Sequence, residues 1–374
     1  MSAPRPMKLA ILGTRGVPAS YGGFETFAQE LAPRLVARGH DVSVYCRSQY
    51  VDPSRRDYEG VRLVHAPTIR HKYLDTVVHT AASTLHALTQ RYDAVLFCNA
   101  ANAIFCPWPR LVGTRVVLNV DGIERKRKKW NAFGRAWYLG SEWLSTWCPN
   151  AIVTDAEVME AYYQERYGAA STFIPYGCHI GRDAGMDALR RFGLEAQPYI
   201  LYVSRLEPEN NALAVIQAYE QTTIPYKLVV VGDAPYAREY IRTLHATAGP
   251  RVVFTGGVYG AGYRELQCHA LAYVQATEVG GTHPALVEAM GFGNCVLAND
   301  TPEHREVLGD AGLFFDAHRP ETLSELLGRV VADPSLVEAY RARATARAAA
   351  RFSWDRVTEQ YDAILRPPRT EGRS

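Results

Sequence analysis

Short apolar runs alternate with amphipathic stretches through the first half of the chain. Six runs have the length and composition of buried strands, at residues 9–12, 42–46, 61–65, 94–98, 116–120 and 152–154. The stretches between them have helical spacing, and continuous apolar runs are typical of parallel strands that are covered on both faces. This half is therefore predicted to form a doubly wound parallel sheet.

The same alternation restarts after a polar, turn-rich stretch at residues 176–197. A second Rossmann-like sheet is predicted from runs at residues 199–203, 227–231, 252–254, 272–274, 295–298 and 313–315. We place one domain at residues 1–180, a second at 181–351, and a terminal helix at 352–366 that packs back toward the first domain. Because open α/β sheets bind ligands at the carboxyl ends of their strands, we expect the active site between the domains.

Composition limits the function classes. A chain of 374 residues exceeds the usual size of a single core. Its 41 Lys and Arg against 39 Asp and Glu leave a formal charge of +2, which does not indicate nucleic-acid binding. Seven scattered cysteines with no C-x-x-C pair indicate reduced thiols rather than a zinc site or disulfides. No apolar run reaches the ~18 residues of a membrane span, so we expect a cytoplasmic protein, at most peripheral to a membrane, without a cofactor.

A glycine-rich segment follows the first predicted strand. It runs from Gly13 to Gly22 and Gly23, after which a helix begins. Glycine lets a ligand approach the backbone, and a helix start offers unpaired N–H groups to an anion. The alternative is ordinary turn chemistry. The spacing does not match G-x-G-x-x-G, which argues against a dinucleotide-dependent dehydrogenase.

The second domain offers two candidate phosphate sites. Arg205 lies just past the strand at 199–203, where a guanidinium could grip phosphate oxygens; the alternative is a surface ion pair with Glu207 or Glu209. Farther along, a segment of small and polar residues precedes a helix and could bind an anion at the helix start; it contains Gly281, Thr282 and His283.

Glu288 lies about one turn into that helix. Its carboxylate could accept hydrogen bonds from both hydroxyls of a ribose. The alternative is a solvated carboxylate on a helix surface.

A further carboxylate follows the strand predicted at residues 116–120. Asp121 could orient or deprotonate an acceptor hydroxyl at the strand end, and Glu124 is the next-best carboxylate. An Asp-Gly pair is also an ordinary turn.

A basic run at residues 125–129 leads into a tryptophan-rich stretch. Lys126, Lys129 and Trp130 are candidates for binding an acceptor, because cations and interfacial aromatic residues suit an anionic membrane or a lipid diphosphate. A solvated charged face with core tryptophans is the alternative. No D-x-D triplet occurs in the chain, so we expect no metal on the diphosphate, whose charge would be met by arginine and helix ends.

Several of these motifs together resemble a known family. Gly22-Gly23 with its helix, Arg205-Leu206 after a strand, residues 284–290 and the helix beginning at 352–354 resemble the retaining family-four glycosyltransferases with the GT-B fold, across essentially the whole chain. A closer resemblance is to a rhamnosyltransferase-like subgroup whose amino-terminal half was catalogued as a domain of unknown function. It rests on residues 13–18, 22–26, 121–122, 129–130, 208–211 and 280–282.

The resemblance implies transfer of a hexose, with L-rhamnose as the best match, from a dTDP- or UDP-sugar to a lipid-linked saccharide precursor of a bacterial surface polysaccharide. It implies retention of the anomeric configuration and a place at the inner face of the plasma membrane. In the implied mechanism, Arg205 and the helix start stabilise the leaving diphosphate, and Glu288 binds the ribose. Gly22 and Gly23 contact the diphosphate or the acceptor. Asp121 contacts the sugar or the acceptor.

The chain departs from the general family at three places. Asn210 and Asn211 occupy the stretch where the family usually has a lysine near the diphosphate, so we assign Asn210 to the donor site. Gly280 stands where the first of two paired glutamates is expected, and Asp121 stands where many relatives have a histidine. Two alternatives therefore remain: a non-catalytic nucleotide-sugar-binding protein, and a nucleotide-sugar epimerase with the same fold.

Overall fold

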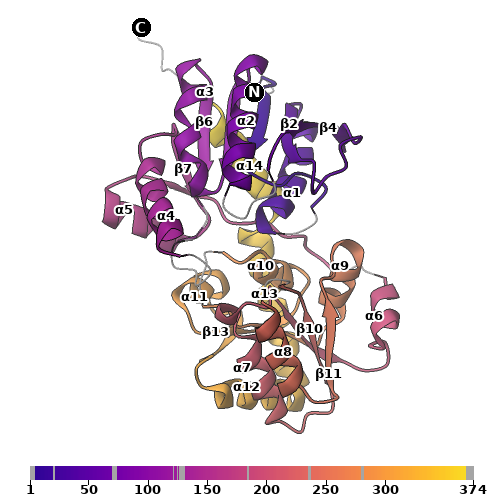
Figure 1. Ribbon diagram of the computed structural model, residues 1–374. Coiled ribbons are helices and arrows are strands. Elements are labelled where there is room, and N and C mark those ends of the chain that lie inside the picture. The colour runs from indigo at the N-terminus through magenta and orange to yellow at the C-terminus, as the bar shows by residue number, and fades with distance from the viewer. Residues whose placement is uncertain are drawn as a thin grey trace. The chain divides into compact units, whose positions relative to one another are not determined.

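The computed structural model describes residues 5–19, 22–69, 74–120, 122–123, 125, 131–182, 185–234, 237–278 and 282–367. The chain divides into two compact units (Figure 1). One comprises Met1–Tyr176 with Trp354–Ser374, and the other comprises Gly177–Ser353. Each unit contains one sheet with its own core.

The described part of the amino-terminal unit contains an eight-stranded sheet in the order β3-β4-β2-β1-β5-β6-β7-β8. The strands are β1 (Lys8–Leu12), β2 (Asp41–Arg47), β3 (Asp57–Tyr58), β4 (Val61–Ala66), β5 (Ala94–Cys98), β6 (Arg115–Asn119), β7 (Ala151–Thr154) and β8 (Thr172–Phe173). The six strands predicted here are confirmed. These six strands pair in parallel as expected, and the short edge strand β3, which was not predicted, pairs antiparallel with β4.

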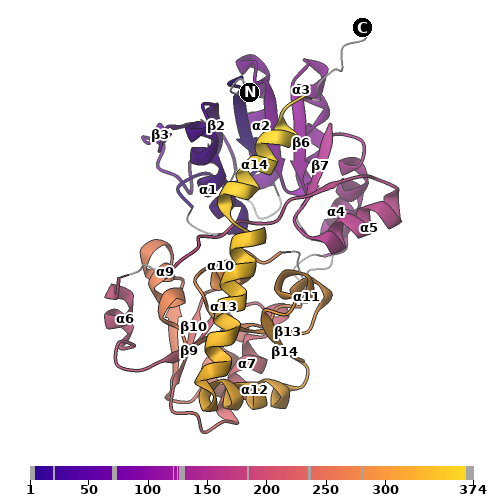
Figure 2. The ribbon, with the colours of Figure 1, turned by 180° about the vertical axis from the view of Figure 1, so that it is seen from behind.

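Helices cover both faces of this sheet. They are α1 (Gly23–Ala37), α2 (Asp75–Gln90), η1 (Ala100–Phe105), α3 (Pro107–Leu111), α4 (Ala132–Ser145), α5 (Glu157–Tyr167) and α14 (Trp354–Leu365). The terminal helix α14 lies along α1 and the central strands β5 and β6 (Figure 2). The Tyr361 ring lies 5.0 Å from that of Phe27, and its hydroxyl accepts a hydrogen bond from Asn119 at 2.7 Å.

The carboxyl-terminal unit has the strand order β11-β10-β9-β12-β13-β14, and every pairing in it is parallel. Its strands are β9 (Tyr199–Val203), β10 (Lys227–Val231), β11 (Val252–Gly256), β12 (Ala272–Gln275), β13 (Cys295–Asn299) and β14 (Gly312–Phe315). These confirm the six predicted runs. The order is that of a doubly wound nucleotide-binding sheet.

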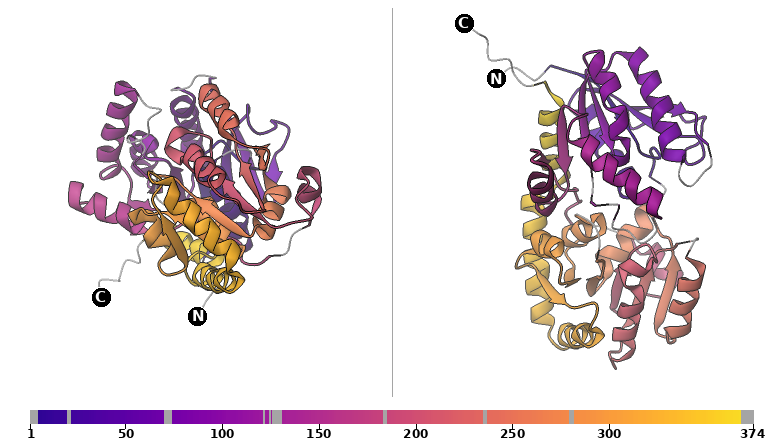
Figure 3. Two further views of the ribbon diagram at one scale, coloured as in Figure 1. Left: turned by 90° about the horizontal axis from the view of Figure 1, so that it is seen from below. Right: turned by 60° about the vertical axis from the view of Figure 1, so that its left-hand side comes forward.

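Helices also line both faces of this second sheet (Figure 3). They are α6 (Asp187–Phe192), η3 (Pro208–Asn210), α7 (Ala212–Glu220), α8 (Arg238–Thr247), α9 (Gly260–His269), α10 (Pro284–Gly291), α11 (Pro302–Leu308), α12 (Pro320–Ala332) and α13 (Pro334–Arg351). Alternate residues of the strands, such as Ile200 and Tyr202 of β9, share one core with α7 and α12. The intervening residues, such as Leu201, are also buried, as strands covered on both faces require.

Among the described residues, no helix is long and apolar enough to cross a bilayer.

The end of α10 packs tightly against the segment that opens the carboxyl-terminal unit. Gly181 N donates to Gly291 O at 3.0 Å, and a Cβ on Gly291 would lie 2.1 Å from the carbonyl oxygen of His179. Because a backbone atom blocks that position, the chain itself would have to move to admit a side chain.

We predict opposite effects of alanine at two helical glycines. Gly291→Ala should lower the free energy of unfolding by about 1–3 kcal/mol through overpacking. Gly328→Ala should raise it by about 0.5–1 kcal/mol, because a Cβ at Gly328 of α12 would meet nothing within 4 Å. Urea unfolding of the three proteins measures both values, and equal effects would contradict the packing described.

Candidate functional site

The strand order of the carboxyl-terminal unit reverses between β9 and β12. From β9 the chain adds β10 and β11 on one side, and it then returns to add β12, β13 and β14 on the other. Ligands of open α/β sheets bind outside the carboxyl ends of the strands at such a reversal. The loops that leave β9 and β12 carry Arg205 and His283, so the structure brings these two predicted regions to neighbouring strand ends.

Arg205 is held at this point and is still accessible. Its Nη2 lies 3.6 Å from the carboxylate of Glu207, whose side chain is 4% exposed, whereas the Arg205 side chain is 32% exposed. The ion pair with Glu207 considered from the sequence is therefore present. Within the described part of the chain, however, no acceptor lies within hydrogen-bonding distance of the guanidinium, so its donors can face a ligand.

The backbone next to Arg205 is fixed by Asn210, which is buried. Asn210 Nδ2 donates to Arg205 O at 2.7 Å, and the hydroxyl of Tyr202 donates to Asn210 O at 2.6 Å. Asn210 thus holds the backbone of the loop that carries Arg205. The donor-binding role assigned to it from the sequence stays a prediction.

Asn211 ties the two loops together. Its backbone is left-handed, with φ 58°, and its Nδ2 donates to Ala276 O and to Glu278 Oε1, both at 2.9 Å. Glu278 N donates back to Glu209 O at 3.1 Å. The loop that follows β9 is therefore locked to the loop that follows β12.

Gly232, directly after β10, lies against the backbone of Ser204, at the start of the loop that carries Arg205. Its φ is +142°, and a Cβ there would lie 1.7 Å from Ser204 O. Only glycine allows the end of β10 to run this close to the residue preceding Arg205.

A buried polar network supports the start of α10. Nδ1 of His304 is 2.7 Å from Asn299 O. Because a carbonyl oxygen can only accept, Nδ1 carries the proton of this ring. Nε2 of His304 is therefore an acceptor, and it accepts from the Thr277 hydroxyl at 3.4 Å. With its single proton used, Thr277 Oγ1 must accept from His283 Nε2 at 3.2 Å. His283 is the N-cap residue of α10, so this network holds the side chain at the helix start that was predicted to bind an anion. Thr282, beside it, is buried.

Glu288 is half-buried on α10 and is oriented by a tyrosine of α9. The Tyr263 hydroxyl donates to Glu288 Oε2 at 2.7 Å and accepts from Gln267 Nε2 at 3.0 Å. Burial and then the Glu288 charge raise the pKa of Tyr263 well above its usual range, which keeps the hydroxyl a donor. The sequence did not indicate Tyr263 as part of the site.

A hollow of about 360 Å³ also lies in this unit. Its walls come from residues 179–181, Gly185, α9 and Phe292. None of the predicted site residues lines it.

In the amino-terminal unit, side chains accept hydrogen bonds from two backbone N–H groups of the glycine-rich segment, those of Arg15 and Ala19. Glu25 is buried at the start of α1 and accepts from Arg15 N at 2.9 Å, while Gln29 accepts from Ala19 N at 2.7 Å. Burial raises the pKa of Glu25, although the nearby Arg15 opposes that rise. Gly22 has φ +110° and precedes α1. Ligand binding by Gly22 and Gly23 stays a prediction.

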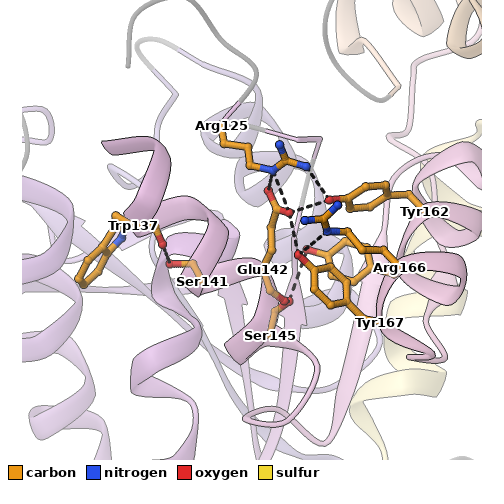
Figure 4. Close-up of polar contacts among 9 residues, drawn as sticks. Arg125, Trp137, Ser141, Glu142, Ser145, Tyr162, Arg166 and Tyr167 are labelled. Carbon is orange, nitrogen blue, oxygen red and sulfur yellow. Dashed lines mark hydrogen bonds and ion pairs between the residues drawn. The ribbon is translucent and has the colours of Figure 1, made fainter. Parts of the chain in front are cut away.

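A second polar cluster in the amino-terminal unit centres on Glu142 of α4 (Figure 4). Arg125 Nε lies 3.0 and 3.2 Å from the two carboxylate oxygens. The hydroxyls of Tyr162 and Tyr167 donate to Glu142 Oε2 at 2.8 and 3.1 Å. Arg125 Nη2 also donates to the Tyr162 hydroxyl at 2.9 Å. This hydrogen bond, together with the negative charge of Glu142, raises the pKa of Arg125. Sequence reasoning missed Glu142, Tyr162 and Tyr167.

Six predicted site residues lie outside the described part of the chain. They are Asp121, Glu124, Lys126, Lys129, Trp130 and Gly281. Within the described ranges, no group of three His, Cys, Asp or Glu residues is arranged to hold a metal ion.

Two family models match the chain, one in each half. Residues 7–179 match a domain of unknown function, DUF1972, and residues 189–348 match glycosyl transferases group 1. Over 181 residues the chain is 28% identical to O-antigen chain mannosyltransferase B of Escherichia coli, which covers 47% of each protein. Over 184 residues it is 26% identical to N-acetylgalactosamine-N,N'-diacetylbacillosaminyl-diphospho-undecaprenol 4-alpha-N-acetylgalactosaminyltransferase of Campylobacter jejuni, covering 48% of this chain and 49% of that protein. The chain thus spans about half the length of these relatives.

Solved structures match nearly the whole chain. Sucrose-phosphate synthase from Thermosynechococcus elongatus has a TM-score of 0.81 at 19% identity, covering 96% of this chain and 98% of that one. Anabaena HepE in complex with UDP-glucose has a TM-score of 0.77 at 16% identity, covering 96% and 99%. At these identities the similarity establishes the fold, which is GT-B as expected.

The histidine network predicts a pH-dependent stability. Burial lowers the pKa of His304 to about 4 from 6.5, so the folded state binds this proton less readily than the unfolded state. Stability from the neutral ring is complete above pH 6.5 and is lost as the pH falls toward 4, by at most about 3 kcal/mol at ~1.4 kcal/mol per pKa unit. His304→Asn should flatten this decline, because an amide donates to Asn299 O but does not titrate.

The free energy of unfolding of the wild type and of His304→Asn is measured between pH 7 and pH 4. His245→Asn is the control, because His245 is exposed on α8 and lies outside this network, so the decline should persist in this variant. A wild-type slope retained by His304→Asn would show that this ring is not the group that titrates.

Proposed function

The chain belongs to the group 1 glycosyltransferases with a DUF1972 amino-terminal half, and on that premise we propose that it transfers a hexose from a nucleotide diphosphate sugar to a lipid-linked saccharide. The acceptor is a precursor of a bacterial surface polysaccharide. The donor is a dTDP- or UDP-sugar, with L-rhamnose as the best candidate, and the anomeric configuration is retained. We place the reaction at the cytoplasmic face of the membrane.

The observation that carries this proposal is the position of Arg205. It follows the carboxyl end of β9 at the reversal of strand order, and the segment after the neighbouring strand β12 leads to the start of α10. A nucleoside diphosphate bound there would receive charge-assisted hydrogen bonds from the guanidinium and the field of the helix start. Both groups stabilise negative charge, and this charge increases on the diphosphate as the bond to the sugar breaks.

Glu288 would bind the ribose hydroxyls, with Tyr263 holding its carboxylate in position. In the proposed step the bond from the sugar's anomeric carbon to the diphosphate breaks, and a bond to the acceptor oxygen forms on the same face. The acceptor proton passes to the leaving phosphate oxygen, so no covalent enzyme intermediate is needed. Asp121 is the candidate for contact with the sugar or acceptor hydroxyl.

The relatives support the class of reaction and differ in the sugar. Their names specify mannose in one case and N-acetylgalactosamine in the other, the latter transferred to a diphospho-undecaprenol acceptor. The HepE structure holds UDP-glucose. Rhamnose and dTDP therefore rest on the motif resemblance alone, and the donor has to be determined directly.

We predict turnover in a metal-free assay with a panel of dTDP- and UDP-sugars and a lipid-linked acceptor mimic. With dTDP-rhamnose, the acceptor mass should rise by one deoxyhexose as dTDP is released. Gain of another sugar would replace rhamnose and keep the reaction. Isomerised donor without acceptor product would indicate an epimerase, and donor binding without either product would indicate a non-catalytic binding protein.

Substitution of Arg205 tests the diphosphate site. Arg205→Ala should lower kcat/KM roughly tenfold to a hundredfold, since a hydrogen bond to a charged group contributes ~1.5–3 kcal/mol. Arg205→Lys should recover only part of the loss, because an ammonium lacks the bidentate geometry. Steady-state kinetics at saturating acceptor measure both variants. Unchanged kcat/KM in Arg205→Ala would place the diphosphate elsewhere.

Tyr263→Phe tests the positioning of Glu288. Loss of the donated hydrogen bond should raise the donor KM severalfold with a smaller change in kcat, because the ribose lies away from the reacting bond. Glu288→Gln should give a larger KM effect in the same direction. A Tyr263→Phe variant with normal donor KM and a defective Glu288→Gln variant would show that Glu288 acts without the tyrosine.

A further inference from the structure

The solvent-facing side of α4 is apolar except at Arg135. Exposed fractions reach 72% for Phe133, 55% for Trp143 and 70% for Trp147, which follows the helix. Spacing of four, three and four residues puts Ala136, Gly140, Trp143 and Trp147 in one row. Arg135 is the exposed charged residue of this helix, since Glu142 is buried in the cluster of Figure 4.

The apolar surface continues onto the neighbouring helix α3. Arg110 Nη1 donates to the carbonyl oxygens of Trp147 and Cys148 at 2.9 and 2.6 Å, which fixes α3 beside the end of α4. On α3, Trp108 is 54% exposed and Leu111 is 80% exposed. We call this α3–α4 surface the aromatic ridge. Large exposed apolar areas of this kind mark contact with a membrane or another partner.

A hollow of about 410 Å³ borders the ridge. It is lined by Arg125, Arg135, Ala136 and Leu139. Arg125 and Arg135 thus border one space, with the apolar residue Leu139 beside them. Arg135 forms no ion pair with any described residue, whereas Arg125 is held rigidly by Glu142.

The charge at this hollow is positive. Among the described residues that line it, Arg125 is compensated by Glu142, which leaves the charge of Arg135. Within the described chain, the Nη1 group of Arg125 donates to no partner. A planar guanidinium with unused donors suits phosphate oxygens.

We propose that the Arg125–Arg135 hollow binds the diphosphate of the lipid that carries the acceptor, and that the aromatic ridge lies against the apolar layer of the membrane. The hollow and the ridge together fit a lipid diphosphate. Such a lipid has its phosphates at the membrane interface and its chains in the apolar layer of the membrane. Tryptophan and arginine side chains favour the same interface. A soluble sugar phosphate would match the hollow and leave the ridge unexplained. The inference rests on the proposed function for the identity of the acceptor, but its test does not require turnover.

The test is co-sedimentation of the full chain with phosphatidylcholine vesicles. Three additives are compared at equal amounts: a polyprenyl diphosphate, the uncharged polyprenol and phosphatidylglycerol. Wild type should bind the diphosphate vesicles at least tenfold more tightly than either of the others. Equal binding to phosphatidylglycerol would show a general anionic surface, and equal binding to polyprenol would show that the hollow does not read the phosphates; either result overturns the proposal.

Arg135→Ala should weaken binding to diphosphate vesicles about tenfold and leave polyprenol vesicles unaffected, as expected for loss of one charge-assisted contact. Arg329→Ala, an exposed arginine of α12, is the matched control and should bind like wild type. Trp143→Ser should weaken binding to all three vesicles, whereas Tyr259→Ser, which alters a side chain 54% exposed in the other unit, should not. Wild-type binding by Arg135→Ala, or no vesicle binding by wild type, overturns the proposal.

The two proposals fail separately. A wild-type chain that binds diphosphate vesicles selectively but transfers no sugar from any donor contradicts the proposed function and leaves this site standing. A chain that transfers sugar to a lipid-linked acceptor equally well with and without Arg135 contradicts this site and leaves the function standing.

Discussion

The tie between the loops after β9 and β12 is the interaction on which the candidate site depends. Parallel strands bring both loops to one edge of the sheet, but they do not fix the distance between the loops. Asn211 does so by donating to Ala276 O and Glu278 Oε1 from one amide nitrogen. Since Asn210 at the same turn also holds Arg205 O, the backbone position from which the guanidinium extends follows from two neighbouring asparagines.

The same edge of the sheet is also supported by a buried hydrogen-bond network at the start of α10. The acceptor Asn299 O fixes the tautomer of His304, that tautomer fixes the Thr277 proton, and Thr277 then orients His283 at the start of α10. Burial keeps His304 neutral, so the network adds no charge to the place where a diphosphate would bind. The amino-terminal unit differs, because Glu25 places a buried carboxylate at the start of α1.

The sequence predicted the sheets well because twelve apolar runs correspond to twelve strands. It missed β3 and β8, which have two residues each and therefore show no periodicity. Arg205 and Glu288 could be selected because each stands at a fixed offset from a predicted strand or helix start. Their partners could not: Asn211 and Glu278 are 67 residues apart, and Tyr263 and Glu288 are 25 apart, so only the tertiary fold pairs them. Glu142 was missed for the same reason, since its partners come from α5 and from Arg125.

The central claim is that a nucleoside diphosphate sugar binds at the carboxyl ends of β9 and β12. Hydrogen exchange of the full chain, measured by mass spectrometry with and without saturating UDP or dTDP in a chelator, tests this claim directly. The account predicts protection in peptides that cover residues 204–211 and 282–291, with little change around α12. Protection confined to the amino-terminal unit, or uniform across the chain, would contradict it.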